Sequence, residues 1–133
     1  MSRRTERRAA AFMLYQRDLT GASVDELYAA YERDTGQPAS DFMRGAVEGA
    51  WNERAALDAA IDDVAEGWTA QRMAVLERNI LRLAVWELGT GEVPPAVAID
   101  EAVELAKRYA SPEAAVFVNG VLGRRAREQG VGR

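Results

Sequence analysis

The chain has 133 residues, 48% of them hydrophobic, which is enough for one domain to bury a core without disulfides or metal ions as staples. Cysteine and histidine are both absent, so the sequence excludes disulfides, thiolate nucleophiles, a histidine general base and the usual zinc ligands. The formal net charge of −4 argues against a protein that binds nucleic acid over its whole surface.

The first predicted helix covers about residues 4–19 and opens with a concentration of arginines. Residues 1–8 contain Arg3, Arg4, Arg7 and Arg8. Positive charge at a helix N-terminus interacts unfavourably with the helix dipole. Helix stability therefore does not explain these arginines, whereas binding of an external anion does. The alternative is a frayed, solvated arm. The apolar side chains at helical spacing on this segment are Phe12, Tyr15 and Leu19.

Two further helices are predicted before residue 70. Residues 23–26, Ser-Val-Asp-Glu, are a capping box that starts the second helix. Ser40 caps a third helix, which is predicted to continue without a break to Trp68 because apolar residues recur along one stripe. Gly45 and Gly49 lie four residues apart in this helix and are expected to let another backbone approach closely.

The C-terminal half predicts three more helices. A helix over about residues 70–88 is apolar on two sides, which is typical of a central, buried helix. Pro94 and Pro95 start the next, where proline at the first position loses no hydrogen bond. Glu104 and Arg108 on that helix are spaced for an exposed i,i+4 ion pair.

A cap at Ser111-Pro112-Glu113 starts the last helix. No segment alternates as a strand does, so the predicted fold class is all-α, a compact bundle forming a single domain over residues 1–133. Residues 1–8 are expected to be a basic arm or the start of the first helix. Residues 128–133 are expected to be a flexible tail.

Charge is distributed unevenly along the chain. Residues 25–66 contain eleven acids and three arginines, whereas residues 1–8 and 124–133 each carry four arginines against a single glutamate. A chain with basic ends and an acidic middle can bind a polyanion at one place only.

The sequence contains no catalytic constellation. It has no glycine-rich phosphate loop and no Ser-His-Asp set. The paired acids at 62–63 and 100–101 are adjacent on helices, so their side chains point about 100° apart and do not chelate magnesium together. We therefore expect no enzymatic activity, no cofactor and no metal site. The three tryptophans, expected in the core or at an interface, are Trp51, Trp68 and Trp86.

Three stretches carry a family resemblance. They are ERNILRLAVWEL at residues 77–88, VAIDEAVELAKRY at residues 97–109 and FVNGVL at residues 117–122. With the arginine-rich opening before Leu14-Tyr15, they closely resemble the NusB family of bacterial transcription antitermination factors. The resemblance covers nearly the whole chain and is weakest at residues 20–40.

The resemblance implies a bundle of six to seven helices. Independently of it, no apolar run approaches the length of a membrane span and the N-terminus does not read as an export signal, so we expect a cytoplasmic protein that contacts no membrane. The resemblance also implies two partners, the small-subunit ribosomal protein NusE and the single-stranded boxA element of nascent ribosomal RNA. Such a complex acts on RNA polymerase, which then transcribes through terminators. The family includes both monomers and homodimers, so the oligomeric state stays open.

Site residues also follow from the resemblance. The implied RNA-binding residues are Arg3, Arg4, Arg7, Glu113, Phe117 and Asn119, to which the charge pattern adds Arg8. The implied NusE-binding residues are Tyr15, Glu77 and Arg82. Thr5 and residues 114–116 depart from the basic or polar residues that relatives often carry there. Packing in the core would also account for the presence of Phe117. An ordinary surface ion-pair network, which contributes little to stability, would also account for Tyr15, Glu77 and Arg82.

Two other readings remain open from the residues. A free-standing NusB-like domain can serve an RNA cytosine methyltransferase, since such domains occur fused to these enzymes. A helical module that binds only proteins fits the acidic middle and the negative net charge. If RNA is the ligand, the small number of arginines predicts modest affinity and a shallow salt dependence, with a second protein on the same RNA raising the affinity.

Overall fold

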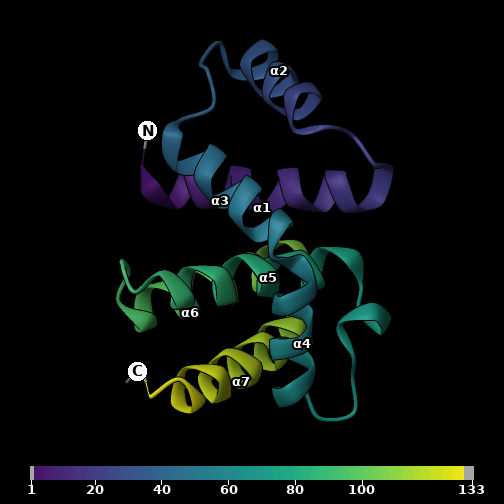
Figure 1. Ribbon diagram of the computed structural model, residues 1–133, viewed down its shortest axis with the longest axis vertical. Helices are drawn as coiled ribbons and strands as arrows, with labels where there is room; N and C mark the ends of the chain where they lie inside the picture. Colours follow the sequence, from purple (N-terminus) through teal and green to yellow (C-terminus); the bar gives the residue numbers. More distant parts are fainter. Residues whose placement is uncertain (1, 131–133) are drawn as a thin grey trace.

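The computed structural model describes residues 2–130, and Met1 and residues 131–133, which include the end of the predicted tail, lie outside the described part. Within it the chain forms helices and no strand (Figure 1), which confirms the all-α class. The elements are α1 (Arg3–Thr20), α2 (Val24–Thr35), α3 (Asp41–Asn52), α4 (Arg54–Val64), the 3-10 turn η1 (Ala70–Arg72), α5 (Val75–Thr90), α6 (Pro95–Tyr109) and α7 (Pro112–Glu128).

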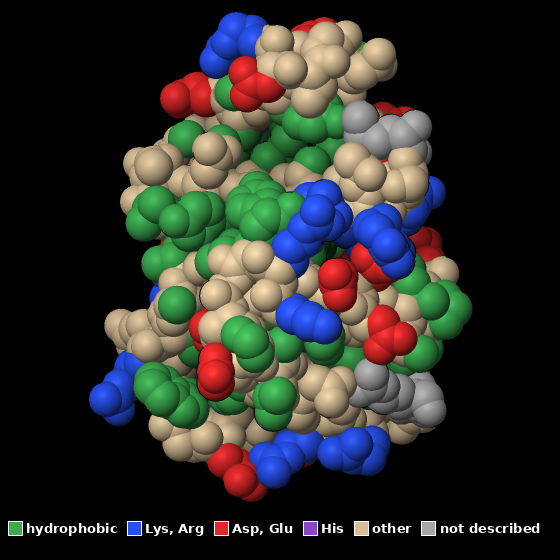
Figure 2. Space-filling model, turned by 180° about the vertical axis from the view of Figure 1, so that it is seen from behind, with side chains coloured by type: hydrophobic (Ala, Val, Ile, Leu, Met, Phe, Trp, Pro, Cys, Tyr) green, Lys and Arg blue, Asp and Glu red, His purple; other side chains and the backbone are tan. Residues whose placement is uncertain are grey.

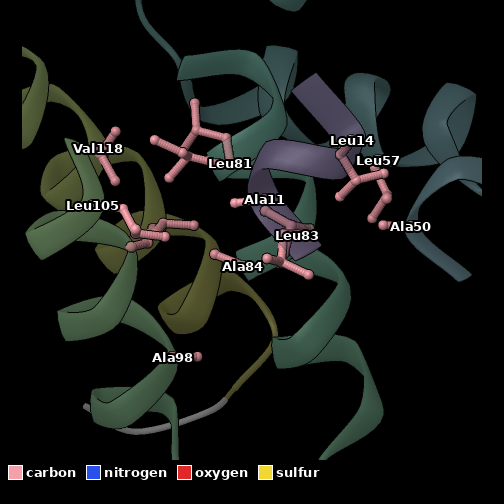
Figure 3. Close-up of a cluster of buried hydrophobic side chains, with 14 of the residues drawn as sticks. Ala11, Leu14, Ala50, Leu57, Leu81, Leu83, Ala84, Ala98, Leu105 and Val118 are labelled. Atoms are coloured by element: carbon pink, nitrogen blue, oxygen red, sulfur yellow. The ribbon is translucent and has the colours of Figure 1, made fainter. Parts of the chain in front are cut away.

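Helix α5 lies at the centre of the bundle. It packs against α1, α3, α4, α6 and α7, as expected for a helix that is apolar on two sides. Figure 3 shows Leu81, Leu83 and Ala84 of α5 in the middle of the buried cluster, with Leu14 of α1 on one side and Val118 of α7 on the other. Helix α2 lies at one end of the molecule, where it packs against α1 (Figure 1).

The long third helix predicted up to Trp68 is wrong. The chain bends at Glu53, so α3 packs against α1 while α4 packs against α5 and α7. A single straight helix cannot follow both surfaces. Helix α4 ends at Val64, and Trp68 follows in a loop with 55% of its surface exposed. A 3-10 turn then precedes α5, which begins five residues later than the sequence predicts.

Helix starts agree better with the sequence because capping is local. Ser23 and Glu26 form the predicted capping box, in which the Glu26 amide donates to Ser23 Oγ at 3.1 Å. The hydroxyl of Ser40 accepts from the Met43 amide at 3.2 Å, and Ser111 caps α7 in the same way.

The predicted close approach of a backbone to Gly45 and Gly49 is also wrong. A Cβ built on Gly45 meets nothing within 4 Å, whereas a Cβ on Gly49 would lie 2.6 Å from ring atoms of Trp86. Gly49 therefore makes room for an indole ring of α5 and not for a backbone.

This contrast gives a first prediction with its own control. Gly49→Ala should lower the free energy of unfolding by about 1–3 kcal/mol, because Trp86 must move to admit the methyl group. Gly45→Ala should raise it by about 0.5–1 kcal/mol, because an exposed helical glycine is replaced by the best helix former. Urea unfolding of both variants measures the two changes. Shifts of the same sign would show that the ring of Trp86 does not control this position.

Candidate nucleic-acid interface

The arginines at the start of α1 are all helical. Ser2 caps the helix, and its Oγ accepts from the Thr5 amide at 3.2 Å. Because successive helical positions point in different directions, the four arginines of residues 3–8 face different surroundings.

Arg7 faces the interior. Its Nε donates to both carboxylate oxygens of Glu87 on α5, at 3.0 and 2.9 Å, and only 7% of Arg7 is exposed. Burial raises the pKa of Glu87, while the hydrogen bond and the charge of Arg7 act in the opposite direction. Arg7 therefore ties α1 to α5, and its charge cannot reach a phosphate unless this buried pair breaks.

Arg3 and Arg4 lie at the surface. Arg4 Nε is 3.1 Å from Glu101 Oε1 on α6, and Arg3 forms a looser pair with Glu6, 3.6 Å apart. The Arg3 guanidinium also stacks on Phe42, with its Cζ 4.1 Å from the ring centroid. Because both arginine side chains are more than half exposed, solvent screens these two pairs, and both arginines can exchange their acid for a phosphate.

Arg8 is half-buried and lies beside the ring of Tyr109. It forms no ion pair with any described residue, and its Cζ is 5.7 Å from the centroid of Tyr109, the last residue of α6. Phe12 makes a T-shaped contact with the same tyrosine, with centroids 5.0 Å apart. The predicted Glu104–Arg108 pair is not formed, and Arg108 lies instead 5.8 Å from the Tyr109 ring. Figure 2 shows the molecule from behind, where Lys and Arg side chains lie beside a band of hydrophobic side chains.

A pocket of about 360 Å³ opens where α7 begins. It brings together Glu113 and Phe117, predicted to bind RNA, with Glu77, predicted to bind NusE. The remaining lining residues are Trp68, Met73, Ala74, Ser111 and Ala114. We call it the Trp68 pocket after the exposed indole in its lining. Helical spacing placed Trp68 on the apolar stripe of a helix, so the sequence did not predict this residue at the surface. Asn119 is exposed further along α7 and does not line it.

The Trp68 pocket adjoins the arginine surface through the chain itself. Tyr109 ends α6, and Ser111, two residues later, caps α7 and lines the pocket. Two residues span at most about 7 Å. The backbone of Tyr109, whose ring lies beside Arg8, is therefore close to the lining of the pocket.

Two of the three residues predicted to bind NusE differ sharply in accessibility. Glu77 is half-buried at the rim of the Trp68 pocket, whereas Arg82 is buried and bonded within the protein. Arg82 donates to both carboxylate oxygens of Asp58 at 2.7 Å and to Asp18 at 3.0 Å. A partner cannot reach Arg82 without breaking this network. Tyr15, the third, is half-buried on α1.

Asp18 is the centre of that network. Its Oδ2 accepts from Arg78 at 2.7 Å, from Asn79 at 2.9 Å and from Arg82. Burial by itself would raise the pKa of Asp18, but the hydrogen bonds from Asn79 and Arg78 and the charges of both arginines lower it below its usual value. The network joins α1, α4 and α5, so it positions α1 from its C-terminal half.

These features define a small all-α protein with a cationic and aromatic surface along α1, the end of α6 and the start of α7. In the described part of the chain, no group of three acids is placed to hold a metal ion. None of the described helices is both long enough and apolar enough to cross a bilayer.

Comparison with known sequences shows the family. The NusB family profile matches residues 4–127. The transcription antitermination protein NusB of Rubrobacter xylanophilus is 47% identical over 123 residues, covering 92% of this chain and 88% of the relative. That of Sorangium cellulosum is 45% identical over 132 residues, covering 97% and 94%. The chain belongs to the NusB family, which confirms the resemblance read from its C-terminal half.

Solved structures agree with the sequence comparison. NusB of T. maritima superposes with a TM-score of 0.86 at 32% identity, covering 96% of this chain and 92% of that one. A crystal structure of the antitermination factors NusB and NusE in complex with double-stranded RNA contains a chain with a TM-score of 0.84 and 29% identity, covering 95% and 96%.

Proposed function

We propose that this protein is a cytoplasmic transcription antitermination factor that binds a single-stranded, boxA-type element of nascent ribosomal RNA together with NusE. The observation that carries the proposal is that Arg3 and Arg4 are exposed at the start of α1, while Arg3 and the half-buried Arg8 lie beside aromatic rings, near the Trp68 pocket. The names of the relatives and the neighbour that contains NusB, NusE and RNA support it. In this role the protein is an adaptor and catalyses no reaction.

The exposed arginines of α1 act on the RNA backbone. Each one that neutralises a phosphate releases condensed counterions, which favours binding at low salt. We assign this role to Arg3, Arg4 and Arg8, and we assign to Arg7 the task of holding α1 in place through Glu87. Exposed rings beside the arginines favour a single strand, because unpaired bases can stack on them and the bases of a duplex cannot.

The Trp68 pocket is where RNA and NusE would meet. Glu113 and Phe117 on α7 are assigned to the RNA, and Glu77 on α5 to NusE, yet all three line one pocket. Asn119 extends the RNA surface along α7, and Tyr15 extends the NusE surface along α1. Two ligands that adjoin at one pocket raise each other's affinity, which compensates for the small number of arginines.

The proposal predicts a salt-dependent and partner-dependent affinity. A fluorescent single-stranded RNA with a boxA-type sequence should bind more tightly when NusE of the same organism is present. Arg4→Gln/Arg8→Gln should weaken binding about tenfold and reduce the slope of log affinity against log salt by about 0.7 for each phosphate that is no longer neutralised. The matched control, Arg33→Gln/Arg54→Gln, removes the same charge from α2 and α4 and should leave affinity nearly unchanged. Arg7 is left intact because its loss would destabilise the fold.

Three outcomes would contradict the proposal. Equal effects of the two double variants would mean that binding follows net charge and no particular site. If a duplex of the same sequence bound more tightly than the single strand, the ligand would be double-stranded RNA. NusE binding with no RNA binding at any salt concentration would leave the protein-only module, which the net charge of −4 favours.

A further inference from the structure

We propose that Tyr109 is a stacking platform for one nucleobase of the bound single strand, with Arg8 and Arg108 supplying positive charge beside it for the flanking phosphates. The inference rests on the proposed RNA-binding function. It adds to that function a base-contacting side chain between the arginines of α1 and the Trp68 pocket.

The Tyr109 ring is both exposed and held in place. It keeps 39% of its surface exposed at the end of α6, although a large aromatic side chain gains most by burial. The T-shaped contact with Phe12, at an interplanar angle of 85°, fixes its orientation. A ring that is already oriented loses little entropy when a base stacks on it.

The guanidinium groups near this ring leave room for a base. Elsewhere in the protein a stacked guanidinium lies close to the ring centre, with Arg3 Cζ 4.1 Å from the Phe42 centroid. The Cζ atoms of Arg8 and Arg108 lie farther from the Tyr109 centroid, at 5.7 and 5.8 Å. At these distances neither guanidinium is in close stacking contact with the ring, unlike Arg3 on Phe42.

The charge around the ring is uncompensated. Arg8 and Arg108 form no ion pair with any described residue, in contrast to Arg4, which is 3.1 Å from Glu101, and to the buried Arg7. The Nε of Arg8 is buried and has no hydrogen-bond partner in the described part of the chain. The protein has a net charge of −4, yet two guanidinium groups without an acidic partner lie beside one exposed aromatic ring. Such a site favours a ligand in which phosphates alternate with flat bases.

The position of Tyr109 also agrees with the path of a strand. Arg8 is one helical turn after Arg4 on α1, and Tyr109 lies next to Arg8. Ser111 then leads into the Trp68 pocket. A single strand that follows this surface passes over Tyr109 before it reaches Glu113 and Phe117.

The test compares Tyr109→Leu with Tyr109→Phe in complexes with NusE and the boxA-type RNA. Leucine removes the ring and should weaken binding about tenfold, whereas phenylalanine keeps it and should bind as the native protein does. The salt dependence should not change with Tyr109→Leu, unlike with Arg8→Gln. Circular dichroism and urea unfolding check that each variant is folded.

RNAs that carry one abasic nucleotide, placed at each position in turn, identify the stacked base. At one position the abasic nucleotide should weaken binding to the native protein about tenfold and have almost no further effect with Tyr109→Leu. Native affinity in Tyr109→Leu, or additive effects at every position, would overturn the inference while leaving RNA binding intact. Weaker NusE binding by Tyr109→Leu without RNA would assign the ring to the protein partner instead. No RNA binding by the native complex would overturn both this inference and the proposed function.

Discussion

The Arg7→Met variant is expected to lose about 3–5 kcal/mol of unfolding free energy at pH 7, because it leaves the buried carboxylate of Glu87 without its partner. Both Arg7 and Glu87 are buried, and the arginine Nε bonds both carboxylate oxygens. Urea unfolding measures the loss. Methionine preserves much of the apolar volume of the arginine, so the change reports mainly on the charge.

Two controls separate the ion pair from packing. Arg7→Met/Glu87→Leu removes both charges and should recover most of the lost stability, because apolar groups of similar size replace buried ion pairs at little cost. The same double variant should keep the salt dependence of RNA binding if Arg7 only positions α1. A double variant as unstable as Arg7→Met would show that the arginine acts through packing, and a reduced salt dependence would return Arg7 to the RNA-binding set.

The loss in Arg7→Met should also depend on pH. Burial already raises the pKa of Glu87, and without Arg7 only the smaller effect of the Arg3 charge opposes that rise. A carboxyl whose pKa is higher in the folded than in the unfolded protein favours folding when it is protonated. The deficit relative to the native protein should therefore be smallest below about pH 4, the ordinary glutamate range, and grow as pH rises through the raised pKa.

Asp18→Ala should cost about 3 kcal/mol of unfolding free energy, because it removes the acceptor shared by Arg78, Asn79 and Arg82. Asn79 is fully buried, so its amide cannot turn to water instead. The matched control is Asp63→Ala on α4, an exposed acid whose removal should change stability by less than about 0.5 kcal/mol.

Asp18 gives a pH dependence of opposite sign to that of Glu87. Its pKa is lower in the folded protein, so its contribution is present above the ordinary aspartate pKa of about 3.9 and is lost as pH falls through the lowered value. The difference between native protein and Asp18→Ala should therefore shrink in strong acid. A difference that stays constant from pH 7 to strong acid would mean that Asp18 acts without its charge.

The fold was largely predictable from local signals, and its main error lies where a local signal is absent. Serine caps and proline positions mark where α2, α3, α6 and α7 begin, because capping bonds involve neighbouring residues only. No cap or proline marks the bend at Glu53. The bend arises because α3 and α4 pack on surfaces that run in different directions. The apolar residues from Ala50 to Val64 have a spacing that is compatible with one helix or with two.

The sequence predicted the basic segment of the candidate site, but it did not predict which of its arginines are exposed and which are buried. Four arginines in residues 3–8 indicated an anion-binding helix end. Arg4 and Arg7 look equivalent in the sequence, yet one reaches the surface of α6 and the other a buried acid on α5. The position of Arg108 beside Tyr109 was not predicted, because the i,i+4 spacing of Glu104 and Arg108 favoured an ion pair that the folded chain does not form.

What the sequence determined by itself is the helical class, most helix starts, the family and the basic end of the molecule, because these follow from short-range bonding, from periodicity and from a motif that spans the chain. Only the tertiary structure decided which charges are neutralised inside the protein. Arg7 and Arg82 are buried by the packing of α1 and α4 on α5, and that packing depends on contacts between residues that are 24 to 80 positions apart. The charge that remains for a partner is therefore a property of the folded surface, whereas the total charge is a property of the chain.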